Sequence, residues 1–197
     1  MQPLLITCIV LLWIIVVFNL LLTLGIVRKL NNTPAARTAS LTDNRLQQGE
    51  QAPDFTAETL DAQQVNLATY AGRTIVFLFI STHCNPCREA IPELLELAPM
   101  AAQADVEFVF VILAEVDKAR AFAKQFQITL PVLVAPLPDN DFAEKYKSTS
   151  TPSYCLINGQ GLVQFAGHPM LGGWKKLVAG WRKQKLSNID VALLERR

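Results

Sequence analysis

The chain has 197 residues, of which 51% are hydrophobic and only 18% are charged, and its formal net charge is +1 at pH 7. Charged residues make up about 25% of an average soluble domain, so this composition excludes a disordered chain, a coiled coil and a basic arm that binds nucleic acid. The length allows one domain, of roughly 100–200 residues, and an appendage. Four cysteines are too few for a disulfide scaffold but enough for redox chemistry or one metal site.

The first feature is an uncharged apolar segment from Leu4 to Val27. As a helix it would span about 36 Å, which exceeds the hydrocarbon core of about 30 Å. A cleaved secretory signal would begin with basic residues and have a shorter apolar core, whereas the first charged residue here is Arg28. The sequence therefore predicts a retained transmembrane anchor over residues 1–28 that contacts lipid through residues 4–27, with a cleaved signal as the alternative.

A polar stretch over residues 29–48, which contains Pro34, is typical of a linker. The globular pattern follows, and we assign residues 49–185 to one domain and residues 186–197 to a C-terminal tail without a structural prediction.

The first half of this domain predicts strands followed by a helix. Asp54–Thr59 and Gln64–Leu67 are expected to form a short hairpin. Thr74–Ser81 is a continuous apolar run, as in strands buried on both faces. A helix is expected from Asn85 to Gln103, with a bend at Pro92 because proline clashes with the preceding turn.

A second strand–helix unit comes next. Val106–Ala114 is another buried strand, and Asp117–Phe126 is a helix for which Asp117 is the expected N-cap. Leu130–Val134 is expected to form an edge strand, and Asp141–Lys147 a short helix.

The domain is expected to close with a hairpin and a helix. Ser153–Ile157 and Leu162–Ala166 flank the turn sequence Asn158–Gly161, and Leu171–Gln184 is helical in pattern. Buried strands separated by helices predict a parallel part, and the hairpin adds an antiparallel part. The expected fold class is therefore α/β, a mixed β-sheet with helices on both faces.

The motif that points to chemistry is Cys84-Asn85-Pro86-Cys87, where the first buried strand gives way to a helix. The free N–H groups and positive dipole end of a helix N-terminus stabilise a thiolate there. We therefore expect the pKa of the Cys84 thiol to fall from about 8.5 into roughly the 3.5–7.5 range. Cys84 would be the more exposed, attacking sulfur. Cys87, one turn later, could resolve a mixed disulfide. Pro86 stiffens the turn and is tolerated at a helix start.

A second signal is Thr151-Pro152, immediately before a predicted strand. A proline at a strand entry favours a constrained turn and is compatible with a cis peptide bond.

These features together resemble the thioredoxin superfamily. The opening Gly49–Phe55 and the stretch from Asp61 to Arg73 are similar to membrane-anchored TlpA/ResA-like thiol–disulfide oxidoreductases and to the AhpC/TSA-type redoxin domain. The anchor and the run Phe77–Ser81 are similar to the MauD-type accessory proteins of methylamine dehydrogenase maturation.

The resemblance implies a thioredoxin-like fold that exchanges disulfides with protein partners. It assigns Cys84 as the attacking and Cys87 as the resolving cysteine. Pro152 would be a cis-proline facing the disulfide, and the backbone of Thr151 would pair with the bound substrate. No cofactor and no nucleic acid are implied. The partners would be protein thiols or disulfides and an upstream redox protein.

Two positions depart from the family pattern. Thioredoxins carry a buried acid where this chain has Leu78, and ResA-like proteins carry a glutamate where it has Ala90. The usual proton acceptor for Cys87 is therefore missing, which leaves the direction of electron flow open.

The polar residues also allow other interpretations. A structural zinc site needs four ligands, for which only His83, Cys155 and His168 could join the pair. A c-type haem would need a histidine where Arg88 stands. Cys155 lies in an apolar strand and is expected to be a buried, inert thiol. His83 is either an ion-pair partner of Cys84 or an exposed loop residue.

Two rival functions remain. A peroxiredoxin would use Ser81 as the pocket hydroxyl but has Phe77 where a proline is expected. A non-catalytic, membrane-tethered assembly factor would use the thioredoxin-like surface only for binding.

Location follows from two opposing arguments. Arg28, Lys29 and Arg37 follow the anchor and favour a cytoplasmic domain by the positive-inside rule. Disulfide exchange in the maturation of exported proteins instead belongs outside the cytoplasm, where disulfides persist. We expect an extracytoplasmic domain on a single-pass cell-membrane anchor, with the cytoplasmic orientation as the alternative.

Overall fold

The computed structural model describes residues 11–13, 15–20, 45–148 and 150–194, and side chains as far as residue 183 in the last range. Its contacts divide the chain into two compact units, residues 1–44 and 45–197. In the first unit, residues 11–13 and 15–20 are helical and expose apolar side chains such as Trp13 and Phe18. Within the described residues, no helix combines the length and apolar character needed to cross a bilayer. Most of the predicted anchor and linker lies outside the described residues.

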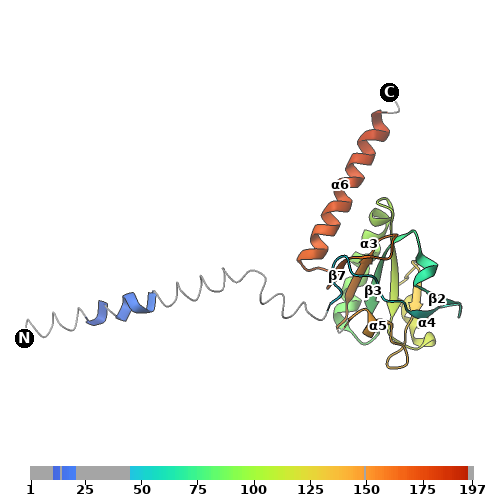
Figure 1. Cartoon of the computed structure of the whole chain (residues 1–197), viewed down its shortest axis with the longest axis horizontal. Coiled ribbons are helices and arrows are strands. Elements are labelled where there is room, and N and C mark those ends of the chain that lie inside the picture. The colour runs from blue at the N-terminus through green and yellow to red at the C-terminus, as the bar shows by residue number, and fades with distance from the viewer. Residues whose placement is uncertain (1–10, 14, 21–44, 149, 195–197) are drawn as a thin grey trace, which may run out of the picture. The chain divides into compact units, whose positions relative to one another are not determined.

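The second unit is built on one mixed sheet (Figure 1). Its described strands lie in the order β2-β1-β5-β4-β3-β6-β7. Their bounds are β1 (Thr56–Thr59), β2 (Gln64–Asn66), β3 (Thr74–Ile80), β4 (Val106–Ile112), β5 (Val132–Val134), β6 (Ser153–Ile157) and β7 (Val163–Gly167). The helices are η1 (Leu67–Tyr70), α3 (Asn85–Ala102), α4 (Val116–Gln125), α5 (Phe142–Lys145) and α6 (Gly172–Leu194). The predicted α/β class is confirmed.

The centre of the sheet is parallel and both sides are antiparallel. β3, β4 and β5 run parallel, whereas β6 pairs antiparallel with β3, and β1 with β5. The expectation that Leu130–Val134 is an edge strand is wrong, because β5 lies between β4 and β1. The burial of all three β5 residues agrees with this interior position.

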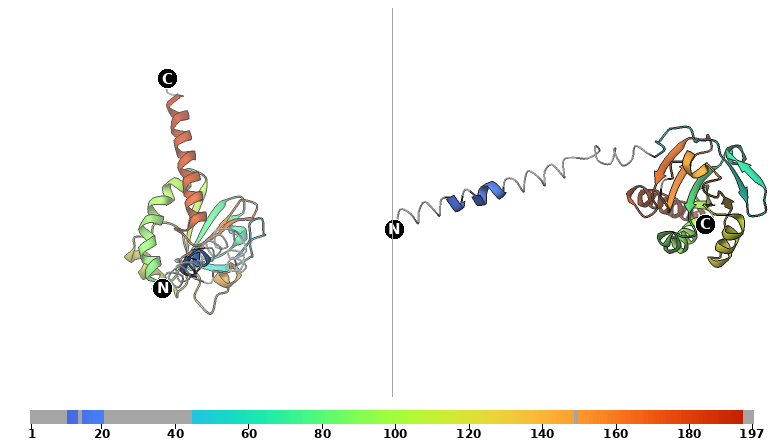
Figure 2. Two further views of the ribbon diagram at one scale, coloured as in Figure 1. Left: turned by 90° about the vertical axis from the view of Figure 1, so that its left-hand side faces the viewer. Right: turned by 90° about the horizontal axis from the view of Figure 1, so that it is seen from below.

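Helices cover the two faces of the sheet unequally. Alternate residues of β3, such as Val76 and Leu78, face a core that α3, α4 and α6 complete. The opposite residues, such as Phe77 and Phe79, pack against Phe55 and the short helix α5. In the right-hand view of Figure 2, the three longer helices lie along one side of the strands. Both β3-α3-β4 and β4-α4-β5 crossovers lie on this side because the strands follow one another in one direction and such connections are right-handed.

Helix α3 runs without interruption through Pro92 and Pro99. Its apolar stripe, including Ile91, Leu94 and Leu97, is buried against the sheet. Tertiary packing of this stripe holds a helix that the two prolines would otherwise weaken.

Three sequence-based boundaries are corrected. α4 begins at Val116 after Glu115, and Asp117 lies inside the first turn, where its carboxylate pairs with Arg120 rather than capping the helix. The chain after Asn66 turns into η1, because Asn66 and Thr69 cap each other reciprocally. The final helix continues to Leu194, so most of the predicted tail belongs to α6.

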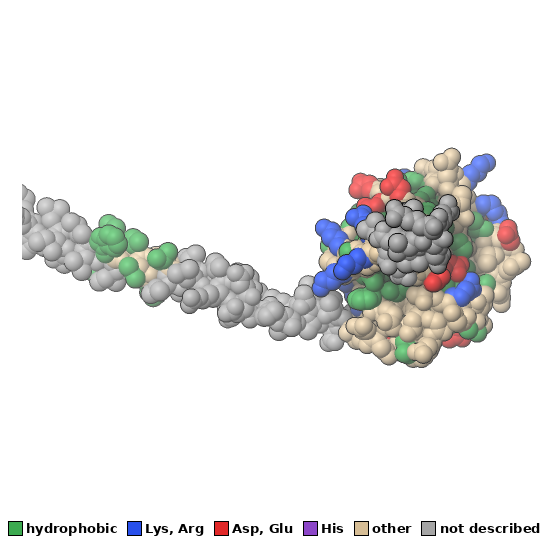
Figure 3. Space-filling model, turned by 90° about the horizontal axis from the view of Figure 1, so that it is seen from above, with side chains coloured by type: hydrophobic (Ala, Val, Ile, Leu, Met, Phe, Trp, Pro, Cys, Tyr) green, Lys and Arg blue, Asp and Glu red, His purple; other side chains and the backbone are tan. Residues whose placement is uncertain are grey.

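Positive and negative side chains are mixed on the face of the domain that Figure 3 draws. Figure 3 shows both basic and acidic side chains on that face of the domain, in keeping with the net charge of +1.

Candidate active site

The site begins where β3 ends and α3 starts. Cys84 is the N-cap of α3 in an extended backbone conformation, and the backbone N–H of Cys87 donates to its Sγ over 3.2 Å. Pro86 lies in the first turn, where the backbone N–H groups have no partner within the helix. Cys84 and Cys87 are joined by a disulfide. The local sequence therefore places one sulfur directly on the N-terminal end of a long helix.

The two sulfurs differ in access. Cys87 is completely buried, whereas Cys84 is half-buried. A partner protein can therefore reach the sulfur of Cys84 first, which agrees with the order expected from the sequence.

The second predicted feature lies against this disulfide. The Thr151–Pro152 peptide bond is cis, as expected, and the carbonyl oxygen of Thr151 lies 3.3 Å from Cys84 Sγ. The sheet register explains this contact across 67 residues, since Ser153 pairs with Phe79 just before β3 ends. The structure thus brings together the four residues on which the sequence interpretation relied.

Arg88 also belongs to this site, although the sequence analysis considered it only as the residue that stands where a c-type haem would need histidine. Arg88 Nη2 donates to the carbonyl oxygen of Thr82 over 2.8 Å and ties the loop before Cys84 to the first turn of α3. Thr82 is buried, and its hydroxyl has no hydrogen-bond partner among the described residues. The sequence feature that could have predicted this role is the position of a basic residue directly after the second cysteine.

The two positions at which the resemblance leads us to expect an acid hold buried apolar side chains in this chain. Leu78 and Ala90 are both buried, and Leu78 lies in the core that packs against α3. His83 is exposed, and its backbone N–H donates to the hydroxyl of Ser81 over 3.4 Å.

The remaining described cysteine is separate from the site. Cys155 is a free, buried thiol on β6, and burial raises its pKa to about 12. Among the described residues, no group of three or more histidine, cysteine or acidic side chains could hold a metal ion.

Comparison with known proteins agrees with this geometry. Residues 48–166 match the AhpC/TSA family. The chain belongs to the AhpC/TSA family. Its AhpC/TSA domain contains both cysteines and Thr151–Pro152.

Two curated relatives and one solved structure narrow the comparison. The Thioredoxin-like protein YneN of Bacillus subtilis is 30% identical over 132 residues, which are 65% of this chain and 75% of the relative. The Thiol-disulfide oxidoreductase ResA of Bacillus thuringiensis subsp. konkukian is 26% identical over 122 residues, 61% of this chain and 69% of the relative.

The thioredoxin domain of a thiol-disulfide oxidoreductase from Bacteroides vulgatus superimposes with a TM-score of 0.57 at 18% identity. It covers 67% of this chain and 96% of that domain, and this likeness shows the thioredoxin fold. The homologues and structural neighbours of this AhpC/TSA domain are thus thiol–disulfide oxidoreductases of thioredoxin fold.

Proposed function

We propose that this protein is a membrane-anchored thiol–disulfide oxidoreductase that exchanges disulfides with protein partners through Cys84 and Cys87. The observation that carries the proposal is the half-buried Cys84 sulfur, which caps α3 and lies 3.3 Å from the Thr151 carbonyl beside a cis-proline. The relatives named as thiol–disulfide oxidoreductases support it.

The exchange proceeds in two displacements. In the reduced protein, the Cys84 thiolate attacks one sulfur of a partner disulfide, and the other partner sulfur leaves as a thiolate. The Cys87 thiolate then attacks the Cys84 sulfur. This forms the Cys84–Cys87 disulfide and releases the second partner thiolate. Two electrons pass to the partner, and an upstream redox protein restores the thiols. The same steps in reverse would oxidise a dithiol.

The helix end supports the first displacement. A thiolate at Cys84 accepts from the Cys87 N–H and lies at the positive end of the α3 dipole, and both effects stabilise the charged form.

Replacing Cys84 with serine tests the reaction directly. We expect the full chain in mild detergent to reduce insulin disulfides with dithiothreitol as the electron source, and Cys84→Ser to lower the rate to the uncatalysed background. Cys155→Ser is the matched control, because that thiol is buried and outside the site. Insulin reduction that survives in Cys84→Ser would refute the proposal.

Replacing Cys87 tests the second displacement and identifies the client. Cys87→Ser leaves the Cys84 sulfur without a resolving thiol, so a mixed disulfide with the partner should accumulate in cells. Mass spectrometry of the trapped complex would name the partner. We propose an exported redox protein undergoing maturation, following the resemblance to methylamine dehydrogenase accessory proteins. A trapped protein that never leaves the cytoplasm would contradict this.

We further propose that residues 1–28 anchor the chain in the cell membrane with the domain on the extracytoplasmic side. The uncharged run Leu4–Val27 supports the anchor, and the stability of disulfides outside the cytoplasm supports the orientation. The test is a reporter enzyme that is active only outside the cytoplasm, fused after Arg197. We expect the reporter to be active, and an inactive reporter would show that the domain lies in the cytoplasm.

A further inference from the structure

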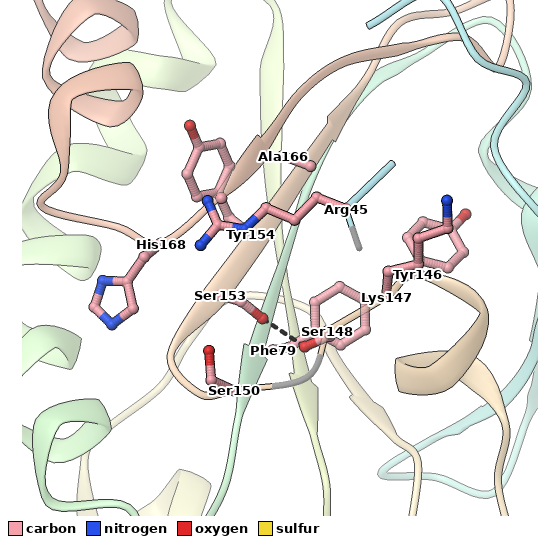
Figure 4. Close-up of a pocket in the computed structure, with 11 residues that line it drawn as sticks. Arg45, Phe79, Tyr146, Lys147, Ser148, Ser150, Ser153, Tyr154, Ala166 and His168 are labelled. Atoms are coloured by element: carbon pink, nitrogen blue, oxygen red, sulfur yellow. Dashed lines mark hydrogen bonds between the residues drawn. The ribbon is translucent and has the colours of Figure 1, made fainter. Parts of the chain in front are cut away.

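A small polar pocket lies beside the cis-proline loop (Figure 4). Its lining includes residues from the end of α5, from the loop before β6, from the end of β7 and from the first described residues of the domain. The space in it that is open to a water-sized sphere is about 20 Å³, room for one small polar group at its inner end. The polar side chains relevant here are Arg45, Lys147, Ser148, Ser150, Ser153 and His168.

The pocket carries positive charge without a counter-charge in its walls. Arg45 and Lys147 both line it, and none of its described lining residues is acidic. Arg45 has no acidic partner among the described residues. Lys147 has Glu50 at 3.9 Å, but this distance is at the outer limit of an ion pair and both side chains are partly exposed, so this pair is weak. An anion that entered would therefore meet unneutralised cations.

The fold leaves room for the Arg45 guanidinium. A Cβ built on Gly167 would lie 3.4 Å from Arg45 Nη1 and 3.7 Å from the Tyr154 hydroxyl. These are ordinary van der Waals distances, so the Arg45 guanidinium and the Tyr154 ring both lie directly beside Gly167. Figure 4 shows Arg45 reaching past Tyr154 towards the side of the pocket that His168 occupies.

Hydroxyl groups complete the opposite wall. Ser148 Oγ and Ser153 Oγ are hydrogen-bonded to each other, and Ser150 Oγ adds a third hydroxyl on the cis-proline loop. A guanidinium and serine hydroxyls that line one pocket offer several donors to a planar group with two acceptor oxygens. A carboxylate has this geometry.

The pocket also lies close to the reacting sulfur. Ser150 precedes Thr151, whose carbonyl oxygen is 3.3 Å from Cys84 Sγ. Neighbouring Cα atoms are about 3.8 Å apart, and an extended peptide covers about 3.3–3.6 Å per residue. A partner segment whose cysteine reaches Cys84 can therefore place a side chain two to four residues away into the pocket.

We infer that this pocket binds a carboxylate of the partner polypeptide, an Asp or Glu side chain near the cysteine that exchanges with Cys84. The inference rests on the proposed function, since it assigns a substrate contact to the same site. Arg45 is the principal ligand, and Lys147 supplies long-range attraction at the rim.

Equilibrium binding tests the pocket without any thiol chemistry. Fluorescent peptides of eight residues would carry serine in place of cysteine. Glutamate or glutamine would be scanned through the four positions on each side of it. The oxidised full chain in mild detergent should bind the best glutamate peptide about fivefold more tightly than its glutamine twin, as expected for one accessible ion pair with hydrogen bonds.

Substitutions locate the effect. Arg45→Gln should reduce the preference for glutamate to less than about twofold, while Lys124→Gln, which removes an exposed cation on α4, should leave it unchanged. Lys147→Gln gives a second pocket variant, expected to lower the preference in part and to weaken its salt dependence. Thermal unfolding followed by circular dichroism confirms that each variant is folded.

The outcomes separate the two proposals. Equal binding of both peptides, a preference that survives Arg45→Gln, or tighter binding of inorganic phosphate than of the glutamate peptide would each overturn the carboxylate pocket. A preference that depends on Arg45, combined with no Cys84-dependent exchange in the insulin assay, would retain the pocket and refute the oxidoreductase.

Discussion

At the scale of single residues, Cys84 and Cys155 show how position decides the reactivity of one side chain. The Cys84 sulfur caps a helix and is partly open to solvent, whereas Cys155 is buried on β6 between its strand partners Phe77 and Ala166. Burial disfavours a thiolate, which is why the pKa of Cys155 rises to about 12.

Alkylation should separate these two thiols. In the reduced native protein at pH 8.5, iodoacetamide should modify Cys84 and leave the peptide containing Cys155 unmodified, and urea should expose Cys155 to the reagent. Mass spectrometry of tryptic peptides reads the result. Rapid labelling of Cys155 in the native state would show that its surroundings are open.

The same pKa predicts an effect of alkaline pH on stability. An unfolded cysteine titrates near pH 8.5, and the folded-state pKa is higher, so the native state binds more protons between these values. The stability that this group contributes is present below about pH 8.5 and is lost as the pH rises towards 12. Cys155→Ala should therefore show a smaller fall in the free energy of unfolding between pH 8 and 10, measured with urea.

At the scale of elements, the long apolar runs and the turn sequence were predictable because their signals are local. Thr74–Ile80 and Val106–Ile112 are strands buried on both faces, as their composition indicates. The interior position of Val132–Val134 was not predictable, because it depends on pairing with a strand more than 70 residues earlier. The sequence analysis ended the last helix at Gln184, whereas α6 continues to Leu194.

Two glycines provide a matched test of the β6–β7 turn. A Cβ on Gly159 would lie 2.9 Å from the backbone of Gly72, which also donates its N–H to the Gly159 carbonyl. Gly159→Ala should therefore destabilise the domain by about 1–3 kcal/mol through overpacking. Gly180 lies on exposed helix surface with nothing within 4 Å of its Cβ position, so Gly180→Ala should stabilise by up to about 1 kcal/mol. Equal shifts in the urea midpoint for both variants would contradict the close approach at Gly159.

At the scale of the whole molecule, the cysteine pair and Thr151–Pro152 could be read from sequence because each is a short pattern. Their contact could not, because the pairing of β3 with β6 creates it. The Arg45 pocket was hidden for the same reason, since its walls come from four separate parts of the chain. Long-range register, not local propensity, thus determines what a partner meets around the disulfide.

The proposed anchor makes a prediction at this scale too. The full chain should remain in the membrane pellet after extraction with alkaline carbonate, whereas a chain lacking residues 1–28 should be released because it lacks the apolar run. Detergent extraction of both forms is the control for aggregation. Recovery of the full chain in the carbonate supernatant would exclude a membrane span.

The pairing of Ser153 with Phe79 has one more consequence. Side chains alternate between the faces of a strand, and β6 is buried on both, so a slip of one residue would send each buried side chain of β6 into the opposite core and is strongly disfavoured. The packing of β6 in the core therefore fixes the distance between Thr151 and Cys84, whatever side chains stand in the loop before β6. Substitutions at residues 148 and 150 should therefore change which partner binds without displacing the Cys84 sulfur. This makes the domain a suitable starting point for engineering disulfide exchange with a new partner.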